Sequence, residues 1–155
     1  MKEHQYQVSI KWTGNQGEGT AAYKAYSRDY SISAKDKANP ILGSSDPSFL
    51  GDKTRYNPED LLVASASSCH MLWYLHLCSV HKIIVVDYED HAEGIMEETA
   101  TGTGAFKEII LNPVVTISAL EDVEKAKELH HEANNMCFIA NSCNFSIKHK
   151  AKIVV

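Results

Sequence analysis

The feature that most constrains the fold is a charge-free stretch, residues 61–79, which directly follows a helix-start signal. Asn57 is a preferred N-cap residue, Pro58 suits the first helical position, and the two acidic residues that follow favour the positive end of the helix dipole. A helix that is apolar on nearly all sides is usually buried. The pattern therefore predicts a long central helix around which the other elements pack.

Segments on both sides of this helix alternate polar and apolar residues, as half-buried strands do. The predicted strands cover residues 5–12, 20–33, 80–90, 92–96, 105–118 and 144–155. A glycine-rich turn joins the first two strands, and residues 35–57 are predicted to be a long loop. Pro113 indicates an edge or a bulge within its strand.

A second helix is predicted from the capping-box pattern Ser118–Glu121 to about Asn135. Its apolar face is formed by Leu120, Val123, Ala126, Leu129 and Ala133. A short helical turn is expected at residues 137–142. Strand pairs and helices in this order indicate an α+β fold.

Composition narrows the class of protein. With 155 residues, 44% of them hydrophobic, the chain can form a single domain over residues 1–155 with its own core. The net charge of −5 is scattered and no basic patch appears, which argues against nucleic-acid binding. No apolar run approaches the roughly 18 residues of a membrane span, and the start lacks a signal-peptide stretch. A cytoplasmic location without membrane association is therefore expected.

Four cysteines in a reducing compartment are better interpreted as thiols than as a disulfide framework. Cys69 lies near the middle of the predicted long helix, after small residues that leave space beside its sulfur. Cys78 is nine residues further, about 180° around the helix, so the two cannot form one site within that helix. No C-x-x-C pair offers a zinc site, and no metal is expected. Cys78 and Cys143 are predicted to be small buried side chains.

A cysteine becomes a nucleophile only when its thiolate is stabilised, and Cys69 lies too far from the start of its own helix for the dipole to help. Arginine is the natural partner because it stays charged even when partly buried. The chain has only two arginines, Arg28 and Arg55. Arg28 is favoured because a strand holds a side chain more firmly than a loop. Arg55, just before the helix cap, remains the alternative.

The histidines leave another chemistry open. His70 adjoins Cys69 but points about 100° away on a helix, whereas His76 lies on the stripe of Cys69 two turns further. His76 is predicted to be a core or interface residue. His130 and His131 lie late in the second helix, where cations suit the dipole. A Cys–His acyl-transfer pair would need a histidine within hydrogen-bond reach of Cys69.

The segment Asn57-Pro58-Glu59-Asp60-Leu61-Leu62, followed by alanines and serines up to Cys69, resembles the reactive-cysteine segment of the OsmC/Ohr family of thiol-dependent hydroperoxide reductases. Trp12-Thr13-Gly14 with Gly17-Glu18-Gly19 is similar to that family's opening hairpin. Cys137, between the second helix and the last strand, matches the family's second cysteine. The resemblance spans nearly the whole chain.

This resemblance implies a peroxidase that acts in defence against oxidative stress. Cys69 would attack the O–O bond of a small hydroperoxide and become a sulfenic acid. Cys137 would then close a disulfide, which a dithiol reductant, lipoyl-type or other, reopens. Arg28 would stabilise the thiolate and hold the peroxide, and Glu59 matches the glutamate that orients this arginine. No cofactor is implied.

The same resemblance implies an apolar substrate site that includes Leu72, Trp73 and Phe138 and favours organic hydroperoxides. Phe138-Ile139 stands where many family members carry proline, so the loop after Cys137 is expected to differ in shape.

The family's fold has antiparallel sheets packed around a long central helix, in an intertwined homodimer with its active sites at the interface. Glu59 and Cys69, ten residues apart, are roughly 15 Å apart along a straight helix. Either an extended arginine bridges this distance, or the helix bends, or Glu59 serves from the partner subunit, and a site built from both subunits is expected. The alternative function is a non-catalytic dimer of this fold that binds an apolar ligand near Trp73 and Tyr74, with Cys69 inert.

Overall fold

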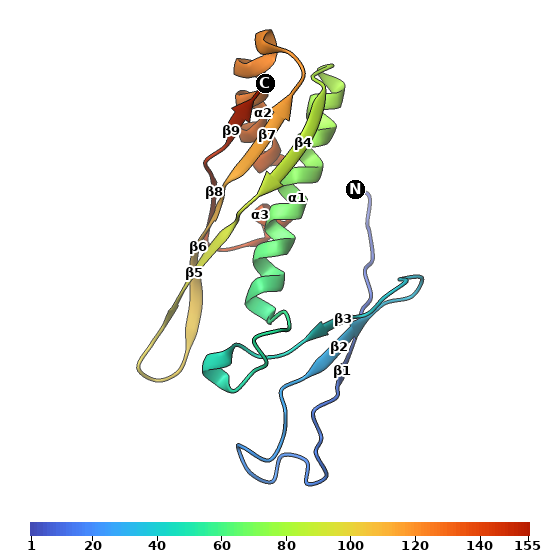
Figure 1. The fold of residues 1–155 in the computed structure, drawn as a ribbon, viewed down its shortest axis with the longest axis vertical. Coiled ribbons are helices and arrows are strands. Elements are labelled where there is room, and N and C mark those ends of the chain that lie inside the picture. Colours follow the sequence, from blue (N-terminus) through green and yellow to red (C-terminus); the bar gives the residue numbers. More distant parts are fainter. The chain divides into compact units, whose positions relative to one another are not determined.

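The computed structural model describes residues 1–155, and the chain divides into two compact units, Met1–Leu61 and Leu62–Val155. In chain order the elements, most of them labelled in Figure 1, are β1 (Ser9–Trp12), β2 (Tyr30–Ser33), β3 (Ile41–Gly43), η1 (Pro47–Phe49), α1 (Pro58–Val80), β4 (Val85–Asp90), β5 (Glu93–Glu98), β6 (Gly104–Leu111), β7 (Pro113–Ile117), η2 (Leu120–Asp122), α2 (Val123–Met136), α3 (Phe138–Ser142), β8 (Ser146–His149) and β9 (Lys152–Val154).

The first unit contains a three-stranded antiparallel sheet of order β1-β2-β3. The predicted hairpin is confirmed, because β1 pairs with β2 from Ser9 opposite Ser33 to Trp12 opposite Tyr30. The second strand is much shorter than predicted, since turns occupy most of residues 20–29. The predicted loop over residues 35–57 is also wrong in part, because it contains β3 and η1. A three-residue strand is too short to show alternation in a sequence.

The predicted start of the long helix is confirmed. The Asn57 side-chain oxygen accepts a hydrogen bond from the backbone N–H of Asp60 at 2.7 Å. The Asp60 carboxylate in turn accepts one from the backbone N–H of Asn57 at 3.1 Å. These reciprocal bonds satisfy donors that a helix otherwise leaves free at its first turn. The start of α1 is therefore fixed by local sequence alone.

The second unit has two three-stranded sheets, of order β4-β7-β9 and β5-β6-β8. The predicted single strand 105–118 is interrupted at Asn112, which separates β6 from β7. The Asn112 backbone N–H donates to Asp90 at 2.7 Å, and its side-chain amide donates to the His91 carbonyl at 2.9 Å. The neighbouring pair of strands, β4 and β5, is interrupted at the same level. Side chains, not a turn motif, therefore set the break.

The predicted last strand is likewise divided into β8 and β9. Both pair in parallel with their neighbours, Ile147 opposite Ile109 and Ile153 opposite Val115. The two sheets are thus mixed, although the pairs β4–β7 and β5–β6 are antiparallel as expected.

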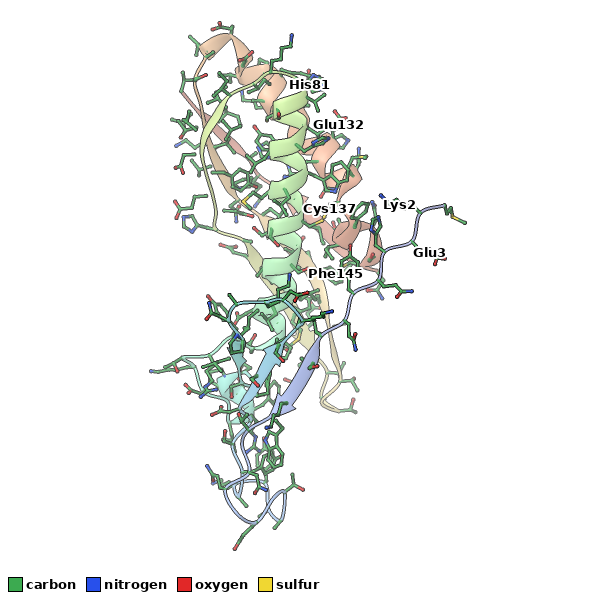
Figure 2. The ribbon with its side chains drawn as sticks, turned by 90° about the vertical axis from the view of Figure 1, so that its right-hand side faces the viewer. Lys2, Glu3, His81, Glu132, Cys137 and Phe145 are labelled. Carbon is green, nitrogen blue, oxygen red and sulfur yellow. The ribbon has the colours of Figure 1, made fainter.

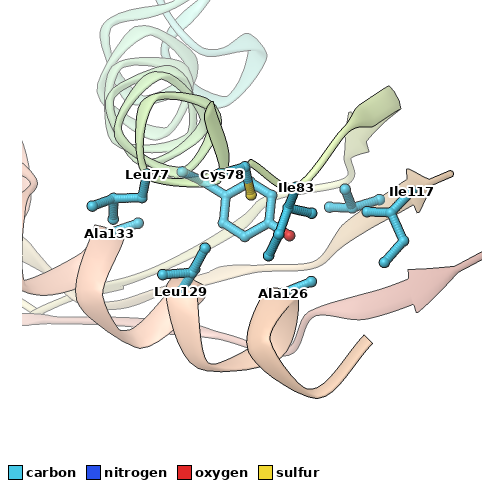
Figure 3. Packing of buried hydrophobic residues seen from close by; sticks show 9 residues of the cluster. Leu77, Cys78, Ile83, Ile117, Ala126, Leu129 and Ala133 are labelled. Carbon is cyan, nitrogen blue, oxygen red and sulfur yellow. The ribbon is translucent and has the colours of Figure 1, made fainter. Parts of the chain in front are cut away.

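One hydrophobic core lies where α1, β7 and α2 meet (Figure 3). Its fully buried side chains include Tyr74 from α1, Val115 from β7 and Leu129 from α2. The predicted apolar face of α2 is confirmed except at Leu120, which is 74% exposed in η2. The predicted capping box does not form, because no side chain caps either η2 or α2.

The long helix α1 is not buried all round, which corrects the prediction from its composition. Its buried residues follow one stripe, Ala66, His70, Tyr74, Leu77 and Cys78, whereas Leu72 is 63% exposed. By length and composition alone α1 is apolar enough to cross a membrane, a property that the core helices of soluble proteins share. The stripe nevertheless packs into the core as in a core helix.

Candidate active site

Two cysteines of the second unit lie in contact, although 67 residues separate them in the sequence. Cys69 is half-buried at the middle of α1. Cys137 is only 1% exposed and connects the end of α2 to the start of α3. Figure 2 shows Cys137 alongside α1, and the Cys137 thiol interacts with the thiol of Cys69. The structure therefore brings together the two sulfurs singled out from the sequence.

The surroundings of Cys137 keep its thiol protonated. Burial, and then the interaction with the Cys69 thiol, raises the pKa of Cys137 to about 11 against the opposing effect of backbone N–H donors. One of these donors is Ala140, whose N–H points to the Cys137 sulfur at 3.4 Å. Cys137 is thus a neutral thiol near pH 7, and the half-exposed Cys69 is the sulfur that a dissolved molecule can reach.

Apolar side chains adjoin the cysteine pair. Trp73 lies one helical turn after Cys69, and Phe138 directly follows Cys137. Their rings pack edge to face, with centroids 5.6 Å apart. A groove of about 280 Å³ is lined by Leu72, Trp73 and His76. The residues expected to bind substrate therefore form one apolar wall, here defined as Leu72, Trp73 and Phe138.

Arg28 belongs to the first unit, and the structure corrects its expected position. It lies in the coil before β2, not in a strand. Its guanidinium donates to the backbone carbonyls of Tyr26 at 2.7 Å and Tyr23 at 2.6 Å. It also packs on both tyrosine rings, 4.1 Å and 4.5 Å from their centroids. The Arg28 guanidinium is thus held by two backbone carbonyls and two tyrosine rings, and none of these groups carries a negative charge.

Arg55 has a different environment within the same unit. It forms ion pairs with Asp29 and Asp52, each at 3.6 Å, so two carboxylates compensate its charge. Glu59 lies in the first turn of α1 near Tyr30, and it contributes, after burial, to raising the pKa of Tyr30. The ion pairs of Arg55 do not include Glu59.

The remaining candidates have structural roles. Cys78 is buried as predicted, and burial raises the pKa of its thiol. Cys143 is half-buried against the second apolar cluster, which is formed by Ala66, Ile109, Leu111 and Ile147. No group of three or more His, Cys, Asp or Glu side chains is placed to hold a metal ion.

The geometry gives no support to a Cys–His pair. His70 faces α2 and bonds to His130, with 3.0 Å between their ring nitrogens. His76 is exposed and packs on Trp73, so it is not a core residue in this chain. The sequence does not predict the contact between His70 and His130, because it joins residues 60 positions apart.

Comparisons with known proteins agree with this architecture. The family model for OsmC-like proteins matches residues 51–152. An OsmC-like protein of unknown function from Vibrio cholerae is 28% identical, with a TM-score of 0.83, and the match covers 97% of this chain and 99% of that one. Among curated proteins, none matches this chain.

Two solved structures of organic hydroperoxide resistance proteins have the same fold. The protein from Elizabethkingia anophelis is 17% identical with a TM-score of 0.67, and the match covers 98% of both chains. The protein from Legionella pneumophila is 18% identical with a TM-score of 0.64, and the match covers 99% of this chain and 100% of that one. The family match spans well over half of the sequence, so this chain belongs to the OsmC/Ohr family of OsmC-like proteins.

Proposed function

We propose that this protein is a peroxidase that reduces organic hydroperoxides with Cys69 and Cys137. The observation that carries the proposal is the contact between a half-exposed sulfur and a buried, protonated one. Membership of the family and the hydroperoxide-resistance neighbours support a redox or stress role.

In the first step, the Cys69 thiolate attacks one oxygen of the hydroperoxide. An S–O bond forms, the O–O bond breaks, and the leaving alkoxide takes a proton to become an alcohol. In the second step, the Cys137 sulfur attacks the sulfenic sulfur of Cys69, so that an S–S bond forms and water leaves. A dithiol reductant then supplies two electrons and two protons to restore both thiols.

The apolar wall of Leu72, Trp73 and Phe138 favours peroxides with a hydrocarbon group. Leu72 and Phe138 are 63% and 66% exposed, so they can contact such a group directly. Burial of each methylene against them contributes about 0.8 kcal/mol of binding energy. Hydrogen peroxide has no such group, which is why the proposed substrate class is organic.

Arg28 is proposed as the cation that stabilises the Cys69 thiolate. Carboxylates already compensate the charge of Arg55, whereas Arg28 is held by neutral carbonyls and tyrosine rings. An uncompensated guanidinium attracts an anion more strongly than one that is already paired. Glu59 remains proposed as the carboxylate that orients the arginine.

The direct test is thiol mapping after one equivalent of an organic hydroperoxide such as cumene hydroperoxide. The reduced protein is treated at pH 7, its remaining thiols are alkylated, and disulfides are located by mass spectrometry of peptides. We expect a Cys69–Cys137 disulfide and one equivalent of alcohol, with Cys78 and Cys143 alkylated. An unreacted Cys69 contradicts the proposal and supports the alternative, in which the apolar wall only binds a ligand.

A homodimer is proposed as the functional form. The exposed Leu72 and Phe138, and the sheet β1-β2-β3, in which no strand residue except Gly43 is buried, present apolar surface typical of an interface. Sedimentation equilibrium of the reduced protein at micromolar concentrations should give twice the chain mass of 17.2 kDa. A single species at the chain mass contradicts the proposed dimer. The thiol-mapping experiment tests the cysteine chemistry independently of this result.

A further inference from the structure

Two buried histidines join α1, which carries Cys69, to α2, which ends next to Cys137. His70 follows Cys69 on α1, and His130 lies seven residues before Cys137 on α2. Both side chains are fully buried. Nε2 of His70 and Nδ1 of His130 are 3.0 Å apart, and the rings lie nearly parallel with centroids 5.3 Å apart. This hydrogen bond links α1 to α2 inside the core.

The bond requires that at least one of the two rings be neutral. A single proton lies between the two nitrogens, and the outer nitrogens, Nδ1 of His70 and Nε2 of His130, have no protein partner. When both rings are protonated, every ring nitrogen is a donor. Two N–H groups then face each other, and two cations share a buried contact. Acidification therefore converts this attraction into a repulsion.

No carboxylate lies among the groups that influence the pair. On α1, Tyr74 stacks on His130 with ring centroids 3.8 Å apart, and burial raises the pKa of Tyr74. On β4, Tyr88 packs against Tyr74 at 6.0 Å, and burial also raises its pKa. Both tyrosines thus stay uncharged near neutral pH and offer no counter-charge to a histidine cation.

The other side of the pair faces more histidines. On β8, His149 lies 5.5 Å from His70 and 5.9 Å from His130, between ring centroids. On α2, the exposed His131 lies 6.5 Å from His149. The nearby carboxylate of Asp90, at the end of β4, accepts hydrogen bonds from Ser67 and Asn112 and not from these histidines. Protonation of His149 on acidification therefore adds positive charge beside the pair.

These surroundings hold both rings neutral in the folded protein. Burial, and then His149, lowers the pKa of His70 to about 4. Burial, and then His70 and His149, lowers the pKa of His130 to about 3. An unfolded chain protonates the same groups near pH 6.5. The stability that they contribute is therefore complete above pH 6.5 and is lost as the pH falls through 5 towards 4 and 3.

We propose that the His70–His130 hydrogen bond is an acid-sensitive clasp that positions α1 and α2 so that Cys69 and Cys137 can form their disulfide. Both histidines are positioning residues, since they act through the helices and do not touch the sulfurs. The link to disulfide formation rests on the proposed function. The acid sensitivity of the clasp does not depend on it.

The acid sensitivity is tested with the double variant His70→Phe/His130→Phe, which keeps stacked rings and removes both titrating groups. Urea unfolding is measured from pH 7.5 to 4.5 for the wild type, the double variant and the exposed control His81→Phe. Below pH 6, two neutral buried histidines raise the unfolding constant about a hundredfold per pH unit beyond the shared background. We expect this extra slope in the wild type and the control. Equal slopes in the wild type and the double variant would overturn the clasp.

The positioning role is tested at pH 7.5 by equilibrating the Cys69–Cys137 disulfide with glutathione, which needs no peroxide. His130→Phe leaves His70 without its partner and should lower the disulfide equilibrium constant by up to about tenfold, the net contribution of one hydrogen bond. His130→Asn, whose amide can replace Nδ1, should recover most of this loss. An unchanged constant in His130→Phe overturns the positioning role.

The two proposals fail in different ways. If the disulfide forms with glutathione but not with cumene hydroperoxide, the proposed peroxidase function is refuted and the proposed clasp is not. A wild-type reaction with the peroxide, together with an unchanged disulfide constant in His130→Phe, refutes the positioning role alone.

Discussion

Replacing Cys69 with serine should lower the rate of organic hydroperoxide reduction by about 10³-fold or more. A serine hydroxyl does not form an anion near neutral pH, and it is not oxidised to an analogue of a sulfenic acid, so no covalent intermediate can form. The measurement is the initial rate of alcohol formation from cumene hydroperoxide with an excess of a dithiol such as dihydrolipoamide.

Matched variants make this result specific. Cys143→Ser, at a half-buried cysteine outside the pair, should retain most of the wild-type rate. Cys137→Ser should still consume one equivalent of peroxide, because its Cys69 reaches the sulfenic acid. Arg28→Met should slow the reaction more than Arg55→Met, since only Arg28 lacks a compensating carboxylate. Wild-type turnover in Cys69→Ser would refute the assigned nucleophile.

Truncation of Leu129 to alanine should destabilise the protein by about 2–5 kcal/mol. The Leu129 side chain is fully buried between α1 and β7, where Figure 3 shows it among the other core residues. The truncation removes buried methyl groups and leaves a cavity, which neighbouring side chains in a closely packed core fill only in part. Urea unfolding of the reduced protein at pH 7.5 measures the change in the free energy of unfolding.

The chain offers a control with the same chemical change nearby. Leu120 is 74% exposed in η2, so Leu120→Ala should change the free energy of unfolding by less than about 0.5 kcal/mol. The difference between the two variants isolates the contribution of burial. Similar effects at the two positions would mean that the core around α2 is not packed as described.

Local signals predicted the fold well where a few neighbouring residues decide the structure. The start of α1 follows from Asn57 and Asp60, which bond to each other across three residues. The capping box at Ser118 failed because Ala119, not Ser118, is the N-cap of η2 and has no side chain that could cap it.

Features set by distant residues could not be predicted in this way. The break between β6 and β7 depends on Asp90 and His91, more than twenty residues before Asn112. Arg28 was assigned to a strand because alternation continued through a segment of turns. The contact of His70 with His130 needed the packing of α1 on α2, and a single sequence shows neither the contact nor its burial.

The position of the two sulfurs also affects the stability of the fold. A bond from Cys69 to Cys137 closes a loop that contains the 67 intervening residues. A covalent link of this span restricts the unfolded ensemble by about 4 kcal/mol in the chain-entropy estimate. Formation of the disulfide would therefore stabilise the folded state, and its reduction would remove this stabilisation. The melting temperature would then differ between the oxidised and the reduced protein.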